Sequence, residues 1–412
     1  MINEKTGQRE LAYVVNIDAI EPIVGSDNCE AAIVGGWRVM VRKGTFKPND
    51  LAIYFEIDSK VPEKPEFEFL AAKHYKVKTQ KYFKGTVISQ GLLMSAEDFG
   101  WENTTTDQFA GNTPIIKRPD GSYLTEGDFL TKELEVTYAE AEDNKRKANS
   151  ADKYKKMAQR RPNIFKKKWA QWMMRRNWGK KVMFFFFGKK KDKQNEWPTW
   201  VVKTDEERIQ NLVYMIPTFQ NEKWIPTEKI DGTSTTFTMK RGKRGKNDFF
   251  ICSRNVVFDK PDKKCFYETN VYTEMAEKYD IENVLKSILD ENKDLLFVTI
   301  QGETYGEGVQ KRDYSIKGHD FMAFNLIFGD ANGVPTRKNP MDMSSILSSY
   351  KIPCVPFFDP IELPDTCDEI LALAGGASTV DGLPREGLVF RTLDGCHSFK
   401  AVDNGFLLKY HG

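Results

Sequence analysis

The 412-residue sequence predicts an α+β protein that begins with a small β-barrel module. Three observations predict this fold class. Short runs of β-branched and aromatic residues, separated by turn signals, fill residues 10–95. Helix-forming residues rich in cations dominate 138–180. From residue 197 onward, apolar strands alternate with helical stretches. A composition of 40% hydrophobic and 29% charged residues excludes a disordered or collagen-like chain.

The N-terminal module is predicted over residues 1–135. Residues 11–17, 32–42 and 50–57 are runs typical of strands, and turn signals such as Gly25 and Pro48 separate them. Several short strands at this spacing favour an OB-like β-barrel. Residues 96–135 are expected to be rich in loops.

Residues 136–196 are predicted to be a basic, helical, aromatic-containing linker or insertion. Residues 141–195 hold 19 Lys and Arg against 4 Asp and Glu, so this stretch carries +15 and the remainder carries −13. Its cations could neutralise RNA phosphates while its aromatics stack on bases. The alternatives are a structural linker and a membrane-surface segment. The candidate RNA-binding residues are Lys166, Lys167, Lys168, Arg175 and Arg176.

Residues 197–412 are predicted to form the third domain, with apolar strands such as 296–300 and a helical stretch over 272–290. No apolar run approaches the roughly 20 residues of a membrane span, so we expect no membrane partner. The six cysteines lie far apart without a Cys-x-x-Cys pair, which favours reduced thiols and a cytoplasmic location. We expect a monomer.

The most informative segment is Thr-Glu-Lys-Ile-Asp-Gly, which contains Lys229. It predicts a strand, a tight turn at Asp231 and Gly232, and a second strand of alternating Thr and apolar residues. Lysine is a nucleophile only when neutral, and burial beside other cations would lower the pKa of Lys229 toward that form. Taken alone, Lys-x-Asp-Gly also suits an ordinary hairpin.

Further charged residues recur near strand ends. Ser-Arg-Asn presents Arg254, and Gln-Gly-Glu places Glu303 directly after a strand that is predicted to be buried. Arg-Glu-Gly places Glu386 at the beginning of a strand, and Ser-Phe-Lys places Lys400 on one. Together they supply a lysine nucleophile, carboxylates for Mg²⁺ and ribose, and cations for a triphosphate. This is the inventory needed for attack on an α-phosphate.

This order of motifs resembles the covalent nucleotidyltransferase superfamily of ATP-dependent ligases and mRNA capping enzymes. Thr-Glu-Lys-x-Asp-Gly, Ser-Arg-Asn, Gln-Gly-Glu, Ala-Phe-Asn, Glu-Gly-Leu-Val and Ser-Phe-Lys are similar to an RNA ligase. The matching branch has an N-terminal OB-like module and is known from amoebal and deinococcal RNA ligases. Residues 202–211 resemble its nucleotide-contacting segment. The resemblance covers about 10–135 and 197–410, and it implies a nucleotidyltransferase domain of antiparallel sheets with flanking helices.

The resemblance implies an ATP-dependent RNA ligase of RNA repair that uses Mg²⁺ or Mn²⁺. Lys229 would attack the α-phosphorus of ATP and expel pyrophosphate. AMP would then pass to an RNA 5′-phosphate, and a 3′-hydroxyl would attack the RNA-adenylate to seal the strand. The expected partner is RNA with 3′-OH and 5′-phosphate ends, in a nicked duplex.

The resemblance also implies a role for each motif residue. The catalytic residues would be Lys229, Asp231 and Lys400, and the metal would be held largely through water by Asp231, Glu303 and Glu386. Glu228 would read the adenine edge and Phe324 would pack on the base. The nucleotide-contacting residues would be Arg208, Glu228, Lys229, Gly232, Arg254, Glu303, Phe324 and Lys400.

One position departs from the family pattern. The last motif of the family commonly reads Lys-x-Lys, whereas this chain has Val402 two residues after Lys400. Lys409 is a candidate replacement for the second lysine.

Two other functions remain open at this point. A GTP-dependent mRNA capping guanylyltransferase uses the same lysine chemistry, but its OB module usually follows the catalytic domain. A non-catalytic RNA-binding protein on a ligase fold is the second alternative.

Overall fold

The computed structural model divides the chain into two compact units. One unit contains residues 1–137 and 197–412, and the other contains residues 138–196. The structure describes all residues except 4, 7, 83–86, 107–112, 140–166, 175, 177, 179–181, 184–196, 243–245, 255, 259–269 and 412.

The first two sheets of the N-terminal module are antiparallel and surround one core. β5 (Leu51–Phe55) pairs with β1 (Ala12–Asn16) and with β9 (Leu92–Met94). β3 (Cys29–Val34) pairs with β2 (Ala19–Pro22) and with β4 (Trp37–Arg42). In β4, Trp37, Val39 and Val41 are buried while Arg38 and Arg42 are exposed, as in a strand with one solvent face. The buried residues of both sheets pack into one cluster.

Part of the stretch expected to be loops forms a third sheet, so that expectation is wrong there. β11 (Thr113–Lys117) pairs with β10 (Glu102–Thr106) and with β12 (Tyr123–Leu124). The polar sequence of β10 hides the strand from a search for apolar alternation. The remaining elements of the module are β6 (Ser59–Lys60), paired with β13 (Thr137–Tyr138), β7 (Gln80–Tyr82), paired with β8 (Val87–Ser89), and the 3₁₀ helices η1 (Pro65–Lys73) and η3 (Ala96–Phe99).

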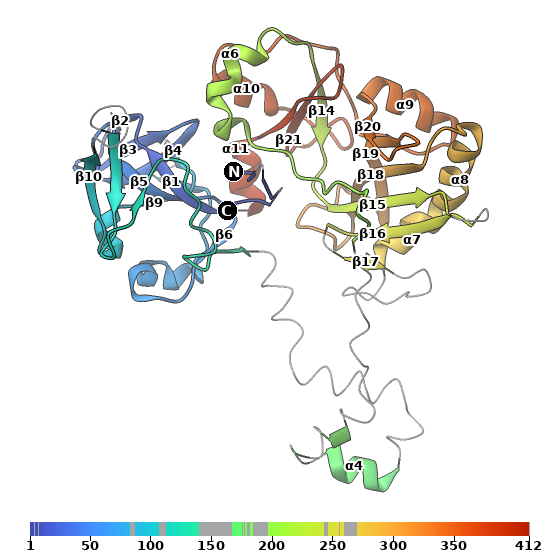
Figure 1. Ribbon diagram of the computed structural model, residues 1–412, viewed down its shortest axis with the longest axis horizontal. Helices are drawn as coiled ribbons and strands as arrows, with labels where there is room; N and C mark the ends of the chain where they lie inside the picture. The colour runs from blue at the N-terminus through green and yellow to red at the C-terminus, as the bar shows by residue number, and fades with distance from the viewer. Residues whose placement is uncertain are drawn as a thin grey trace. The chain divides into compact units, whose positions relative to one another are not determined.

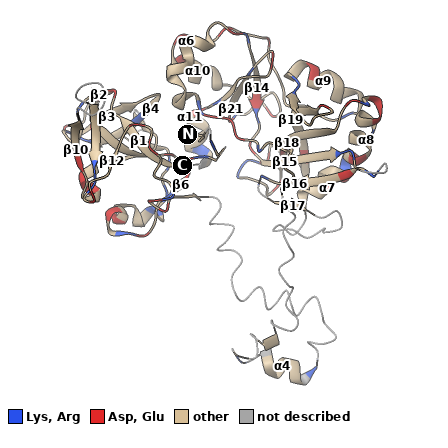
Figure 2. Cartoon of the chain, in the orientation of Figure 1, with Lys and Arg blue, Asp and Glu red and all other residues tan. Residues whose placement is uncertain are grey.

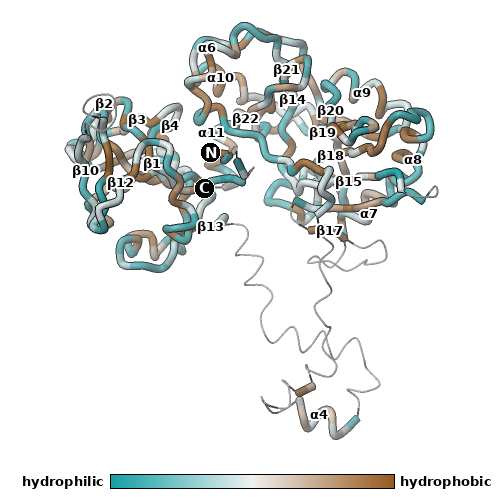
Figure 3. The backbone as a smooth tube through the Cα atoms, in the orientation of Figure 1, coloured by the Kyte–Doolittle hydropathy of each residue, from teal (hydrophilic) through white to brown (hydrophobic). Residues whose placement is uncertain are grey.

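A six-stranded antiparallel sheet forms the larger part of the second half of the chain. Its order is β17 (Val257–Phe258), β16 (Asp248–Cys252), β15 (Thr233–Lys240), β18 (Phe297–Gly306), β19 (His319–Gly329) and β20 (Pro335–Arg337). Helices α7 (Val271–Lys278), α8 (Ile281–Glu291) and α9 (Pro340–Ser349) lie along one side of it (Figure 1). The apolar residues of this sheet face and of the helices form one buried cluster. Hydrophobic residues concentrate along the central strands (Figure 3), while charged residues lie along the helices (Figure 2).

The helical stretch predicted over 272–290 is divided into α7 and α8. Asp280 adopts a left-handed conformation, with φ of 48°, between the two helices. A non-glycine residue in this region interrupts an α-helix.

A three-stranded antiparallel sheet carries the lysine motif. Its order is β14 (Trp224–Lys229), β21 (Gly387–Thr392) and β22 (Ser398–Val402). β14 does not pair with β15, so the predicted hairpin is wrong: the turn at residues 230–232 passes the chain from one sheet to the other. One face of this sheet is covered by η4 (Ile209–Asn211), η5 (Val213–Met215), α6 (Ile216–Phe219) and α10 (Cys367–Ala374). The last elements are α11 (Asn404–Phe406) and a π-helix over Leu407–His411.

The second unit contains α4 (Lys168–Met174). Among the described residues, no helix combines the length and the apolar character that a bilayer span requires. The α+β class predicted from the sequence is confirmed.

Candidate active site

The two motif lysines lie on one face of the three-stranded sheet. Lys229 is opposite Gly387 of β21, and Lys400 of β22 is opposite Val389. Cross-strand partners share a face, and Gly387 and Val389 are two residues apart. Lys229 and Lys400 therefore project to the same side, whereas Glu228 projects to the other.

An extended segment crosses the polar faces of both sheets. On the six-stranded sheet, Gln301 donates to the carbonyl of Val202 (2.7 Å), and Thr204 and Ser234 share a hydrogen bond of 2.8 Å. On the three-stranded sheet, the amide of Lys400 donates to the carbonyl of residue 207 (2.7 Å). This segment therefore passes beside Lys400 and brings Asp205 to its ammonium group.

Carboxylates surround the ammonium group of Lys229. Its Nζ lies 2.7 Å from Oε1 of Glu386, the residue just before β21. Burial opposes the positive charge, but Glu386, followed by Glu303 and Asp231, raises the pKa of Lys229 above its ordinary value. The expected lowering is wrong because these strongest charged neighbours are acidic. A neutral nucleophilic amine therefore requires that the carboxylate charge be neutralised.

Glu303 lies inside β18 rather than after it, which corrects the predicted strand end. Burial raises the pKa of Glu303 to about 8; Lys229 opposes this, and Glu386 and Asp231 raise it further. The described residues contain no group of three or more His, Cys, Asp or Glu that could hold a metal ion directly. The three carboxylates fit a cation such as Mg²⁺, which keeps several of its waters when a protein binds it.

A β-bulge shapes the strands beside Glu303. Gln301 pairs with Asn325 and Gly302 pairs with Ala323, so Phe324 is the extra residue of β19. Bulges bend a strand and re-aim a side chain. Phe324 is half-buried in the cluster that also contains the residue after Lys229. The bulge thus places an aromatic ring near the predicted nucleophile.

Gly232 allows the loop after Lys229 to approach β18. A Cβ at this position would lie 2.4 Å from the carbonyl oxygen of Thr304 and 2.9 Å from Cγ of Glu303. The same loop is held from another side, because the amide of Asp231 donates to Oη of Tyr314 (2.7 Å). These two contacts position Asp231.

The ammonium of Lys400 joins a cluster of cations around Asp205. Lys400 Nζ lies 3.0 Å from Oδ1 of Asp205, while Arg254 Nη2 and Arg9 Nε lie 2.8 Å and 3.1 Å from Oδ2. Burial lowers the pKa of Lys400 to about 8; the charge of Arg9 lowers it further, and Asp205 opposes this. A partly buried cation cluster of this kind suits an anionic ligand.

Arg208 lies next to this cluster. Its backbone forms a parallel bridge with Lys400, and its guanidinium lies 3.5 Å from Asp58 and 5.9 Å from the ring centroid of Trp37. Its Nη1 is buried and finds no hydrogen-bond acceptor among the described residues. A buried donor of this kind fits a phosphate oxygen.

Glu228 is held apart from the lysines. Its carboxylate accepts hydrogen bonds from the hydroxyl of Ser378 and from the amide and hydroxyl of Thr379, the last two at 2.9 Å. The structure therefore brings Lys229, Asp231, Glu303, Glu386 and Lys400 into one region, and places the Glu228 carboxylate on the other face of β14, against Ser378 and Thr379.

Three residues were missed by sequence reasoning. Asp205 lies in the 202–211 segment, so that segment was a usable signal for it. Tyr314 and Arg9 had none, because Arg9 meets Asp205 across 196 positions of sequence and only the tertiary fold brings them together.

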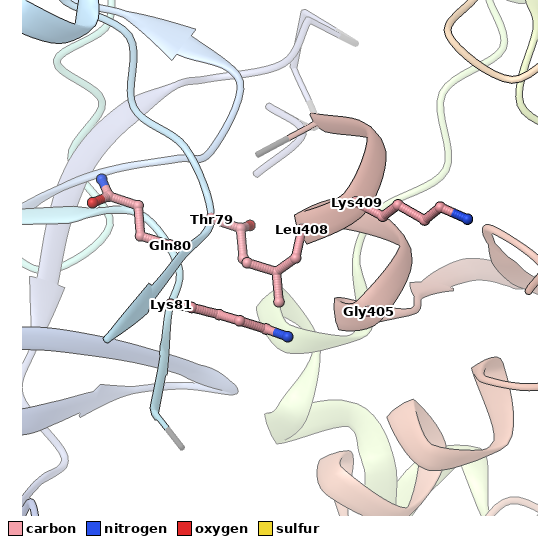
Figure 4. A pocket seen from close by; sticks show the side chains of 6 residues that line it. All are labelled: Thr79, Gln80, Lys81, Gly405, Leu408 and Lys409. Atoms are coloured by element: carbon pink, nitrogen blue, oxygen red, sulfur yellow. The ribbon is translucent and has the colours of Figure 1, made fainter. Parts of the chain in front are cut away.

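Lys409 is exposed in the C-terminal π-helix, with its Nζ 4.9 Å from the ring centroid of Tyr410. It lines a cavity of about 490 Å³ with Leu408, Gly405 and residues 79–81 (Figure 4). Neither Lys229 nor Lys400 lines this cavity. The structure therefore offers no support for Lys409 as the second cation of the last motif.

Comparisons with known proteins bear on the family and the fold. A family model for an OB-fold domain matches residues 11–96, and one for RNA ligase matches residues 222–411. Residues 222–411 belong to the RNA ligase family. No curated protein matches this RNA ligase by sequence. The matches confirm the predicted family, the OB-like module, the fold class and the enzyme class.

Solved structures of an RNA ligase from Naegleria gruberi resemble this RNA ligase over nearly its whole length. A mutant solved with ATP and Mn is 26% identical, with a TM-score of 0.69, and the match covers 98% of this chain and 100% of that one. The structure with PPi is 25% identical, with a TM-score of 0.67, and the match covers 97% and 98%. A mutant with AMP and Mn is 25% identical, with a TM-score of 0.67, and the match covers 98% and 99%.

Proposed function

We propose that this RNA ligase joins RNA 3′-OH and 5′-phosphate ends with ATP. The Lys229 amine attacks the α-phosphorus, a phosphorus–nitrogen bond forms, and the bond to pyrophosphate breaks. An RNA 5′-phosphate oxygen then takes the AMP from the lysine. Finally, a 3′-hydroxyl attacks the activated 5′-phosphate, which forms the phosphodiester and releases AMP. The ATP and AMP bound by the Naegleria gruberi relatives support this choice of nucleotide.

One observation carries the proposal: Lys229 and Lys400 share a sheet face beside three acidic groups. Lys229 is the nucleophile, while Lys400 and Arg208 neutralise phosphate charge in the transition state. Such chemistry depends mainly on alignment and charge neutralisation. Bound Mg²⁺ or Mn²⁺ near Asp231, Glu303 and Glu386 supplies the positive charge that offsets the carboxylates around Lys229.

The nucleoside contacts belong to the same proposal. Arg254 and Glu303 hold the ribose, and Phe324 packs on the adenine. Gly232 keeps the lysine loop close to the nucleotide. Glu228 reads the adenine edge, and hydrogen bonds from Thr379 orient its carboxylate.

Transfer of label from ATP to protein tests this function. Wild type incubated with α-³²P-ATP and Mg²⁺ or Mn²⁺ should carry AMP on Lys229, as located by mass spectrometry. Lys229→Ala should take no label. Lys223→Ala, which removes a half-exposed lysine just before β14, is the matched control and should label normally. Labelling by GTP alone would favour the capping enzyme, and labelling by neither nucleotide would favour a binding protein.

We further propose that the 136–196 segment binds RNA. Lys167 and Arg176 are exposed, whereas the side chain of Lys168 is not described, and Lys166 and Arg175 lie outside the described residues. Trp169, Trp172 and Trp178 are about half exposed, and the Arg176 guanidinium lies 3.8 Å from the Trp172 ring centroid. Exposed indoles among cations suit stacked bases and phosphates.

Replacing all five candidate cations, residues 166–168, 175 and 176, with Gln should weaken RNA binding and flatten its salt dependence. Lysine adenylylation should persist, because these residues lie outside the site described above. Unchanged RNA affinity would indicate a structural linker. Loss of binding to anionic vesicles alone would indicate a membrane surface.

The oligomeric state, the location in the cell and the form of the RNA substrate are also part of the proposal. We propose that the protein is a monomer and that it acts on nicked duplexes. We also propose a cytoplasmic location, which is supported by the free thiols at Cys29, Cys252, Cys354, Cys367 and Cys396. Ligation of 5′-phosphorylated RNA as a single strand and as a nicked duplex tests the substrate. Faster joining of the single strand would contradict the duplex preference.

A further inference from the structure

Arg9 lies outside every predicted motif and reaches the region of the phosphate-binding lysine. It precedes β1, and its side chain is 9% exposed. Its Nη1 lies 2.8 Å from Oε2 of Glu56, its Nε lies 3.1 Å from Oδ2 of Asp205, and its Nη2 lies 3.3 Å from the carbonyl of Glu206. A planar guanidinium can hold two carboxylates at once in a fixed geometry. Arg9 therefore ties the end of β5 to the segment that carries Asp205.

The Glu56 end of this link is rigid. Glu56 is buried and accepts hydrogen bonds from Oη of Tyr13 (3.1 Å) and Nδ2 of Asn211 (2.9 Å). Burial opposes its charge, but the amino terminus and Arg9 hold the pKa of Glu56 at about 2. The carboxylate that anchors Arg9 is therefore ionised throughout the neutral range.

The Asp205 end of the link reaches Lys400. Asp205 is the carboxylate in contact with the Lys400 ammonium, at 3.0 Å. Among the described residues, the charges that act most strongly on Lys400 are Arg9, Arg208 and Lys229, which are positive, and Asp205, which is negative. Burial opposes the charge of Glu206, but its ion pair with Arg391 at 3.2 Å, together with the charge of Lys400, lowers the pKa of Glu206. Arg9 is thus both a support for the partner of Lys400 and a fixed positive charge near it.

The last motif lacks a second cation of its own. Val402, where the family pattern has a lysine, is 2% exposed and packs in the core cluster that includes residues of the N-terminal module. No side chain at this position supplies charge to the site. Arg9 arrives from the opposite end of the chain.

We propose that Arg9 is a positioning residue for lysine adenylylation: it holds Asp205, orients Lys400 for the phosphates of ATP, and supplies the second positive charge that Val402 does not. The inference rests on the proposed function, because its ligand is the triphosphate of ATP. The N-terminal segment therefore completes a site that the catalytic motifs leave one cation short.

The test measures single-turnover adenylylation with α-³²P-ATP across pH. Arg9→Met should slow the reaction at neutral pH by roughly 10- to 100-fold, as expected for a lost charged hydrogen bond. It should also shift the alkaline limb of the pH–rate profile to higher pH, because a positive charge that lowers the pKa of Lys400 is gone. Arg9→Lys keeps the positive charge but loses the planar guanidinium that contacts two carboxylates. This variant should therefore be slowed less than Arg9→Met, and its alkaline limb should lie at the wild-type pH. Arg118→Met removes an arginine that pairs with Glu133 at 2.7 Å and is the matched control.

A second variant shows whether Arg9 acts through Asp205. Arg9→Met should slow adenylylation by a smaller factor in an Asp205→Asn background than in wild type, because the effects of substitutions at contacting residues are not additive. Circular dichroism checks folding, and if Arg9→Met unfolds, the Arg9→Lys and Asp205→Asn proteins carry the comparison.

Two results would overturn the inference while wild type still labels. One is an Arg9→Met protein with the wild-type rate and pH profile. The other is an Arg9→Met protein whose alkaline limb is not shifted and which is slowed equally in adenylylation and in the joining of a 5′-adenylylated RNA. That result would indicate a general loss of structure. A wild-type protein that takes no label overturns the proposed function itself, and this inference with it.

Discussion

Substitution of Gly232 by alanine tests whether the lysine loop must lie against β18. The added Cβ would lie 2.4 Å from the carbonyl oxygen of Thr304, whereas ordinary contact begins at 3.4 Å, so the loop must move by about 1 Å. The second close contact, 2.9 Å to Cγ of Glu303, directs the displacement onto a predicted active-site carboxylate. A misplacement of about 1 Å can cost roughly 100-fold in rate.

We therefore expect Gly232→Ala to slow formation of lysyl-AMP by roughly 100-fold, and to destabilise the fold by about 1–3 kcal/mol through overpacking. Single-turnover labelling with α-³²P-ATP measures the rate, and urea denaturation measures the stability. Gly375→Ala is the matched control, because its Cβ meets its nearest neighbours only at 3.4 and 3.5 Å. A Gly232→Ala protein that labels within about threefold of wild type would show that this close approach does not position the site.

Three further predictions concern charge, metal and core packing. Adenylylation should fall as pH rises above about 8, because the lowered pKa of Lys400 leaves its ammonium charged below that value and neutral above it; a limb near the ordinary 10.5 would contradict this. Chelation by EDTA should abolish labelling but leave the urea midpoint unchanged, because the carboxylates form no direct metal cage among the described residues; a lowered midpoint would indicate a structural ion. Trp224→Ala should cost about 3–5 kcal/mol in urea denaturation, because its ring is fully buried against Phe219 and Phe399; a loss below about 1 kcal/mol would contradict the packing.

Two of the wrong sequence predictions concern Lys229, and both arose because a local pattern does not specify which distant residues pack beside it. The motif around Lys229 looked like a hairpin because two strand-like runs flank an Asp-Gly turn. Strand pairing is a long-range choice, and β14 pairs instead with a strand some 160 residues away along the chain. The predicted direction of the pKa shift of Lys229 was wrong for the same reason, because its neighbours Glu386 and Glu303 are distant from it in the sequence.

The sequence by itself determined the reaction class, because a nucleophilic lysine, its carboxylates and a second lysine stand in strand-like contexts in a specific order. The run around Ser-Phe-Lys was enough to predict that Lys400 lies on a strand, and β22 confirms it. Which residues meet that lysine depends on register and on packing between segments. Only the tertiary structure showed that Asp205 contacts Lys400 and that Tyr314 and Arg9 belong to the site, because each of these contacts joins residues that lie far apart in the sequence.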